Sequence, residues 1–175
     1  RDPRWGRTEE GYGEDPFLIG EMTTAYTQGM AGDHPTYRRV IPTLKHFCAN
    51  NNEKERNSCS SNVTPRTLRE YYYRAFEASI VRGGTGSMMT AYNELSGVPA
   101  CMNPDLKTLV KKQWGLEFIV TDGADFSQNV LAHHSHATHA EALAACLKNG
   151  NDVMTDEADM VAAAARDALD RGLLT

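Results

Sequence analysis

Two acids follow a short apolar segment in the stretch EFIVTDGADF, which covers residues 117–126. Asp122 comes directly after the apolar run and Thr121, and Asp125 comes three residues later. A carboxylate at the end of a buried strand can serve as a nucleophile or as a general acid or base, because the strand fixes its position. We favour Asp122 as the reacting group, since Asp125 lies beyond a glycine on an expected loop, where its position is less determined.

Other apolar segments also end on polar side chains. These residues are Lys45 and His46, Tyr92 and Asn93, and Thr155 and Asp156. In parallel α/β folds the carboxyl ends of the strands form the active face. Each of these residues alone is more often an ordinary surface side chain, but four segments that deliver polar groups to one rim favour a functional site.

Helix signals alternate with these segments. Asp15-Pro16, Thr64-Pro65 and Asn103-Pro104 each place an N-cap residue before a proline, and Thr138 with Glu141 fits a capping box; both patterns are typical of helix starts. Helices are expected near residues 15–31, 64–82, 103–114, 138–149 and 157–171, with glycines after their ends at 32, 83, 115, 150 and 172. Strands are expected at 39–47, 86–92, 117–122 and 152–155. Their nearly continuous apolar character is typical of strands buried on both faces.

The alternation of strand and helix predicts an α/β fold with a parallel sheet. Four such units suit either a doubly wound sheet or part of a (β/α)8 barrel, which needs roughly 250 residues when complete. The chain has 175 residues, lacks an initiator Met and opens within a motif, RDPRWGR. We therefore expect a partial (β/α)8 TIM-type barrel, with residues 1–175 forming one domain truncated at both ends.

Composition and charge exclude several classes of protein. The net charge is −5 and no basic stripe is present, which argues against nucleic-acid binding. No apolar run reaches the ~20 residues that span a bilayer, so no membrane partner is expected, and no signal peptide is visible. The cysteines at 48, 59, 101 and 146 form no CxxC motif, so we expect reduced thiols.

The sequence contains no clear motif for a nucleotide cofactor or a metal ion. Neither GxGxxG nor GxxxxGK[ST] occurs, which argues against a dehydrogenase or a kinase. His133, His134, His136 and His139 lie close together but lack familiar zinc spacing, so we favour an exposed loop over a metal site. The polar stretch CANNNEKERN, which follows Lys45, His46 and Phe47, is expected to be a solvated loop, a loop folded over the carboxyl ends of the strands, or both.

Four segments resemble a known family in order and spacing: DPRWGRTEEGYGEDP, KHFCANNNEKER, MMTAYNELSGVPAC and FIVTDGADF. They are similar to the catalytic barrel of glycoside hydrolase family 3, the β-glucosidase and β-xylosidase family. The resemblance runs from residue 1 to the end of the chain and identifies it as part of that family's N-terminal catalytic domain. It implies that Asp122 is the catalytic nucleophile, and that the substrate-binding residues are Arg7, Lys45, His46, Met89 and Tyr92.

The chemistry that the resemblance implies is retaining hydrolysis, in which a carboxylate attacks the anomeric carbon. Lys45 and Arg7 are expected to keep the pKa of Asp122 low. Asp122 and Asp125 are not expected to form the two-acid pair of such an enzyme, because both leave one strand end on the same side. No cofactor or metal is implied.

Some features depart from the family pattern. Gly123 stands where many members have a tryptophan that stacks on the leaving-group sugar, and CANNNEKERN lacks the Asp-Ser-His triplet of the N-acetylhexosaminidase subgroup. The usual acid/base glutamate belongs to a following domain of the parent chain, and the family's substrate-binding aspartate lies upstream of RDPRWGR.

The expected function is hydrolysis of terminal non-reducing β-linked sugars by the parent enzyme, with a β-glycoside or oligosaccharide as substrate. The first alternative to a β-glucosidase is a β-xylosidase or another exo-β-glycosidase of the same family. An alternative of another class is a carbohydrate-binding or inactive fragment, because the partner acid is missing from this chain.

Overall fold

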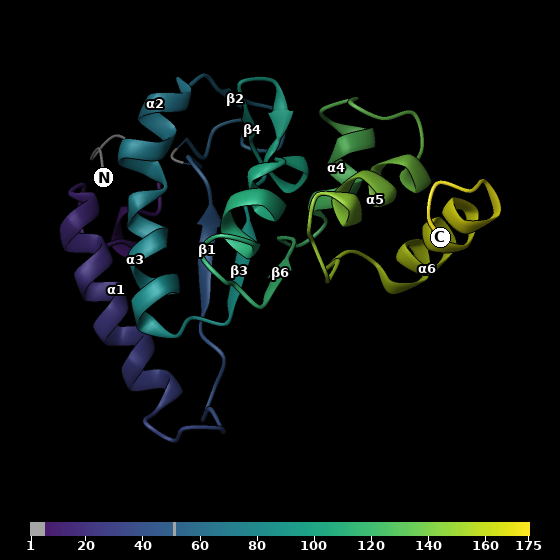
Figure 1. Ribbon diagram of the computed structural model, residues 1–175. Coiled ribbons are helices and arrows are strands. Elements are labelled where there is room, and N and C mark those ends of the chain that lie inside the picture. Colours follow the sequence, from purple (N-terminus) through teal and green to yellow (C-terminus); the bar gives the residue numbers. More distant parts are fainter. Residues whose placement is uncertain (1–5, 51) are drawn as a thin grey trace.

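The computed structural model describes residues 6–50 and 52–175 (Figure 1). Its main sheet contains three parallel strands in the order β1-β3-β6, which are Thr43–Phe47, Ser87–Thr90 and Phe118–Val120. A parallel bridge from Val120 to Val153 extends the sheet by the next segment. Neighbouring strands follow one another in the chain, as in an arc of a (β/α)8 barrel. The expected α/β fold with a parallel sheet is confirmed.

The strands are shorter than expected. β1 begins at Thr43, so residues 39–42 are outside it, and within 152–155 only Val153 pairs with the sheet. The expectation that all strands are buried on both faces is wrong for β1, where Thr43 and Lys45 are exposed. In the described part of the chain β1 pairs only with β3, so it is an edge strand and its exposure follows from that position.

Five α-helices of seven residues or more accompany the strands in the described ranges: α1 Pro16–Ala31, α3 Arg74–Gly83, α4 Asp125–Leu131, α5 His139–Lys148 and α6 Ala158–Asp170. The Asp15 side chain accepts from the backbone N–H of Phe17 at the start of α1. Thr138 and Glu141 form the capping box of α5. These two starts confirm the sequence prediction.

Two expected helices contain wider turns. The helix expected near 64–82 consists of α2 (Pro65–Thr67), a π-helical turn η2 (Leu68–Tyr72) and α3, and the helix expected near 103–114 is a π-helix, η4 (Leu106–Lys111). A π turn adds a residue to the helix register. Tyr73, which follows η2, is buried, and its ring stacks on Phe47 with the centroids 5.0 Å apart.

Some elements were not expected from the sequence. α4 begins at Asp125, where a loop was expected. A second, small sheet joins three short strands in the order β2-β4-β5, namely Ser60–Ser61, Glu94–Leu95 and Val98–Pro99. Short 3₁₀ turns lie at Thr8–Glu10 and Ala100–Met102. The small sheet holds the loops that follow β1 and β3 against each other.

The core has two hydrophobic clusters. One surrounds Phe47 and includes Met88, Leu106 and Ile119, and the other surrounds Phe126 and Leu143. Figure 1 shows α1 and α3 beside β1, and α4, α5 and α6 beyond β6 at the other end of the sheet. Burying each large apolar side chain contributes roughly 1.5–3 kcal/mol, so the sheet is fixed mainly by these contacts.

Close packing of α1 on α3 depends on glycine. A Cβ added at Gly83 would lie 2.5 Å from Thr27 Oγ1, so Gly83 permits a close approach. We expected Gly83 to follow the end of this helix, but it is the last residue of α3. Gly84, with φ of 67°, is the residue that ends the helix.

All four cysteines are free, as expected, and Cys48, Cys101 and Cys146 are buried. Among the described residues, no helix combines the length and the apolar character needed to cross a membrane.

Candidate active site

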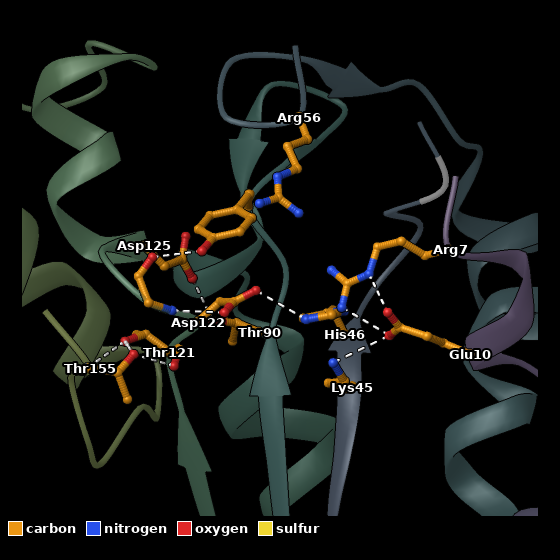
Figure 2. Close-up of polar contacts among 12 residues, drawn as sticks. Arg7, Glu10, Lys45, His46, Arg56, Thr90, Thr121, Asp122, Asp125 and Thr155 are labelled. Atoms are coloured by element: carbon orange, nitrogen blue, oxygen red, sulfur yellow. Dashed lines mark hydrogen bonds and ion pairs between the residues drawn. The ribbon is translucent and has the colours of Figure 1, made fainter. Parts of the chain in front are cut away.

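Asp122 lies at the carboxyl end of the sheet, two residues after β6 ends at Val120. His46, from β1, places Nε2 3.0 Å from Asp122 Oδ2, although β3 separates the two strands (Figure 2). The other carboxylate oxygen, Oδ1, accepts from the backbone N–H of Gly123 at 2.8 Å. The two side chains are only 7% and 18% exposed, so this contact is largely shielded from solvent.

The environment of Asp122 favours its charged form. Burial alone would raise the pKa of this carboxyl, but hydrogen bonds from His46 and from Gly123, with the positive charges of His46 and Arg56, hold the pKa below its usual value. An ionised carboxylate is the form that a nucleophile requires.

Lys45 and Arg7 converge on Glu10 (Figure 2). Arg7 donates Nε to Glu10 Oε1 at 2.7 Å and Nη2 to Oε2 at 2.9 Å, and Lys45 Nζ lies 3.3 Å from Oε2. Chiefly because of the hydrogen bond from Arg7, the pKa of Glu10 falls to about 2. We expected Lys45 and Arg7 to keep the pKa of Asp122 low, but both contact Glu10, and the lowering comes chiefly from the hydrogen bond of His46, with Gly123 and Arg56. The charge of Asp122 acts on Arg7 only after those of Glu10 and Glu53.

Tyr92 follows β3 and lies at the carboxyl ends of the main-sheet strands, which we call the rim and which also carries His46 and Asp122. Its hydroxyl donates to the carbonyl of Gly123 at 2.7 Å, and the guanidinium of Arg56 lies 4.9 Å from the centre of its ring. Burial, and then the charge of Asp122, raise the pKa of Tyr92. Met89 lies within β3, where it pairs with Val120 of β6, and it is half-buried.

Arg56 and Glu10 are site residues that the sequence reasoning missed. Arg56 belongs to the stretch CANNNEKERN, and its position over Tyr92 favours a loop folded over the rim rather than a freely solvated one. Glu10 stands three residues after Arg7, where an acid can pair with the arginine within one turn. The available signals in the sequence were the acid-rich loop that contains Glu10 and the arginine within the charged stretch.

Asp125 differs from its expected position. It is the first residue of α4, its exposed fraction is 2%, and it accepts from Thr90 Oγ1 at 2.7 Å. The expectation of a loosely placed loop acid is wrong, because Ala124 adopts a left-handed conformation (φ 59°) that turns the chain straight into the helix. Burial raises the pKa of Asp125 to about 8.

The four histidines do not converge. His133 is buried, and its Nε2 lies 2.7 Å from the carbonyl oxygen of Tyr92, while His136 contacts Ser135. Within residues 6–50 and 52–175, no three His, Cys, Asp or Glu side chains are grouped so that they could hold a metal ion.

A cavity of about 170 Å³ opens beside Lys45 and His46, between the N-terminal loop, β1 and α3. Glu10 and Tyr72 line it, and Asp122 does not. The rim with Asp122 and this cavity therefore share His46 and Lys45 as a common wall.

Comparison with known proteins identifies the family. The family model described as "Glycosyl hydrolase family 3 N terminal domain" matches residues 1–175. A relative named "Beta-xylosidase" from Formosa agariphila is 36% identical over 158 residues, which cover 87% of this chain and 22% of that protein. The chain thus spans about a fifth of the length of the curated relatives it matches.

Solved structures agree with the sequence relatives. The exo-beta-xylosidase XlnD, in complex with a xylobiose aziridine activity-based probe, matches 98% of this chain and 23% of its own, with a TM-score of 0.91 and 26% identity. Beta-glucosidase 3B from Thermotoga neapolitana, in complex with alpha-D-glucose, matches 100% of this chain and 23% of its own, with a TM-score of 0.79 and 30% identity. The chain therefore belongs to glycosyl hydrolase family 3 and carries its N-terminal domain fold.

Proposed function

We propose that the protein containing this chain is a retaining exo-acting β-glycosidase, and that Asp122 is its nucleophile. The observation that carries this proposal is the ionised Asp122 carboxylate at the carboxyl end of the sheet, bonded to His46 at 3.0 Å. The names of the family relatives, xylosidases and glucosidases, support the reaction class.

In this mechanism an oxygen of Asp122 attacks the anomeric carbon while the bond to the leaving sugar breaks. The leaving oxygen takes a proton from an acid of the parent protein, and a glycosyl-enzyme ester forms. Water then attacks the same carbon, the former acid accepts the water's proton, and Asp122 leaves as a carboxylate. Asp125 is not assigned to the acid, because its carboxyl is buried and bonded to Thr90.

The remaining rim residues would bind the sugar. Lys45, Arg7 and His46 supply N–H groups suited to hydroxyl oxygens, and Glu10 holds the two cations near each other. Tyr92 and Met89 are assigned to the edge of the same subsite. A cluster of charged donors around one carboxylate suits a small polyhydroxylated ligand.

The chain is proposed to be part of a larger (β/α)8 catalytic domain, followed by a domain that supplies the acid/base. The matched relatives and structures extend well beyond this segment, which covers 22% and 23% of the two proteins. One face of α1 supports the proposal, since apolar side chains spaced by four residues are exposed along it: Leu18, Met22, Tyr26 and Met30. Such a face suits a neighbouring helix of the barrel.

The sugar at the non-reducing end is proposed to be glucose or xylose. β-Glucosides are our first choice from the resemblance, and β-xylosides follow from the names of the Formosa relative and of XlnD. A sugar-binding or inactive role for the isolated chain remains the alternative of another class, because the acid/base is expected elsewhere.

The test is to trap the intermediate in the full-length protein. Fluorinated aryl β-glucosides and β-xylosides form long-lived glycosyl-enzymes, and mass spectrometry of peptides identifies the labelled residue. We expect the label on Asp122. A label on Asp125, on Glu53 or Glu55, or on no residue of this segment would falsify the assignment, and sugar binding without label or turnover would favour the alternative.

A further inference from the structure

The turn that carries Asp122 is held in an unfavourable backbone conformation. Residues 122–125 form this turn, which closes when the N–H of Asp125 donates to the carbonyl of Asp122 at 3.1 Å. Ala124 within it has φ of 59° and ψ of 21°. A left-handed conformation costs a residue with a Cβ roughly 1–2 kcal/mol, and such a conformation persists only where the surroundings determine it.

Asp125 is the side chain that joins this turn to the neighbouring strand. Its Oδ2 accepts from Thr90 Oγ1, at the end of β3, while its own backbone N–H closes the turn. Thr90 is fully buried and Asp125 is 2% exposed, so water does not compete for these bonds. The other side of the turn is held by Tyr92, through its bond to Gly123.

A helix-capping role does not account for Asp125. An acid in the first turn of a helix normally acts as a solvated carboxylate near the free N–H groups. Asp125 is instead sealed from solvent, and the charge of Asp122 faces it across the turn. Its contacts lead to Thr90 and to the backbone that carries the proposed nucleophile.

We propose that Asp125 is a positioning residue which, through Thr90, fixes the carboxylate of Asp122 for attack on the anomeric carbon. This inference rests on the proposed function above and adds a role to it. Asp125 touches neither the sugar nor the reacting atoms; it acts by holding the turn.

The carboxyl of Asp125 holds this position in its neutral form. Burial raises its pKa to about 8, and the charges of Asp122 and Asp156 act in the same direction, while the hydrogen bond from Thr90 opposes them. Tyr92 and Cys101 are the other titratable groups affected by its charge. Loss of the proton would place a second negative charge against Asp122, which disfavours the arrangement of the turn.

The experiment compares variants of the full-length protein by the rate at which a fluorinated glycoside labels Asp122. Thr90→Val removes the donor and keeps the shape. Thr85→Val is the matched control, because Thr85 is also buried next to β3 and its hydroxyl bonds Ser79 at 3.0 Å, away from the rim. Asp125→Ala removes the acceptor, and Asp125→Asn retains an uncharged one.

We expect Thr90→Val and Asp125→Ala to label about 10- to 100-fold more slowly, with reagent affinity little changed, since small misplacements of a reacting group have effects of that size. Asp125→Asn should label within about threefold of the wild type. Thr85→Val should label at the wild-type rate although it also loses a buried hydrogen bond. If Asp125→Ala does not fold, the labelling rates of Thr90→Val and Thr90→Ser are compared instead. Serine keeps the hydroxyl donor, so only Thr90→Val should label slowly.

A pH profile gives a readout that a purely structural residue would not change. With a dinitrophenyl glycoside, whose leaving group needs no acid, labelling of the wild type should slow above pH about 8 and that of Asp125→Asn should not.

Wild-type rates in Thr90→Val or Asp125→Ala, an equal loss in Thr85→Val, or the same alkaline slowing in Asp125→Asn would each overturn the inference. A wild type that never becomes labelled on Asp122 would instead overturn the proposed function.

Discussion

Two carboxyl groups three residues apart occupy opposite environments in this molecule. Asp122 faces the rim, where His46 and Gly123 donate to it and its pKa is lowered. Asp125 is buried, its side chain accepts a hydrogen bond from Thr90, and its pKa is about 8. The deeper burial of Asp125, and the hydrogen-bond donors around Asp122, therefore assign the neutral and the charged role.

The contrast between the two acids is tested most strongly by replacing each carboxyl group with an amide. Asp122→Asn should lower kcat on aryl β-glycosides at least ~1,000-fold, because an amide cannot form the glycosyl ester. Asp125→Asn should change kcat less than about threefold. Steady-state kinetics on the full-length proteins, with circular dichroism to check folding, measure the contrast; similar losses in both variants would contradict it.

Loss of the His46 contact should have the next largest effect. His46→Ala removes a hydrogen bond and a positive charge that lower the pKa of Asp122, so this pKa should rise. The acidic limb of kcat/KM should then move to higher pH, and kcat should fall about 100-fold. A pH–rate profile checks both, and an unmoved acidic limb would show that His46 does not control the charge of Asp122.

Glu10 allows a sharper test of the rim. Glu10→Gln keeps the shape but removes the charge that holds Arg7 and Lys45 together. We expect KM to rise roughly tenfold with a smaller change in kcat, because these cations are assigned to sugar binding. Glu9→Gln is the control, since Glu9 is the exposed neighbour in the same 3₁₀ turn. Equal effects in the two variants would remove Glu10 from the site.

Asp125 should also affect the pH dependence of stability. Its pKa is raised in the folded state, so the folded protein keeps a proton that the unfolded chain loses above about pH 4. The stabilising contribution is present below that pH and is lost progressively up to pH about 8. Asp125→Asn cannot ionise. Its melting temperature relative to the wild type should therefore rise between pH 5 and pH 8, as differential scanning calorimetry would show.

Much of the fold could be predicted from the sequence because the signals are local. Caps such as Asp15 and Thr138 indicate where helices start, and apolar runs that alternate with helices predict a parallel sheet. The partners of charged side chains could not be predicted in this way. Glu10 meets Lys45, and Arg56 meets Tyr92, only after distant segments are brought to one rim.

Asp125 shows the same limit most clearly. A glycine and an alanine after Asp122 predict a loop, and the left-handed Ala124 instead starts a helix at once. Only the tertiary bond to Thr90 reveals that the acid is fixed.

The smallest expected effect concerns Ala124, the residue between the two acids. Glycine adopts a positive φ without the steric cost that Ala124 bears at 59°, but it also loses more entropy on folding. Ala124→Gly should therefore change the free energy of unfolding by at most about 1 kcal/mol, in the stabilising direction. Ala163→Gly, at an exposed position inside α6, should destabilise by about 1 kcal/mol and is the matched control.

Because Thr90, Tyr92 and His46 hold the turn from three sides, kcat of Ala124→Gly should stay close to that of the wild type. Denaturant unfolding and initial-rate kinetics test both statements. A large fall in kcat with unchanged stability would mean that the alanine methyl group, and not the surrounding hydrogen bonds, keeps Asp122 in place.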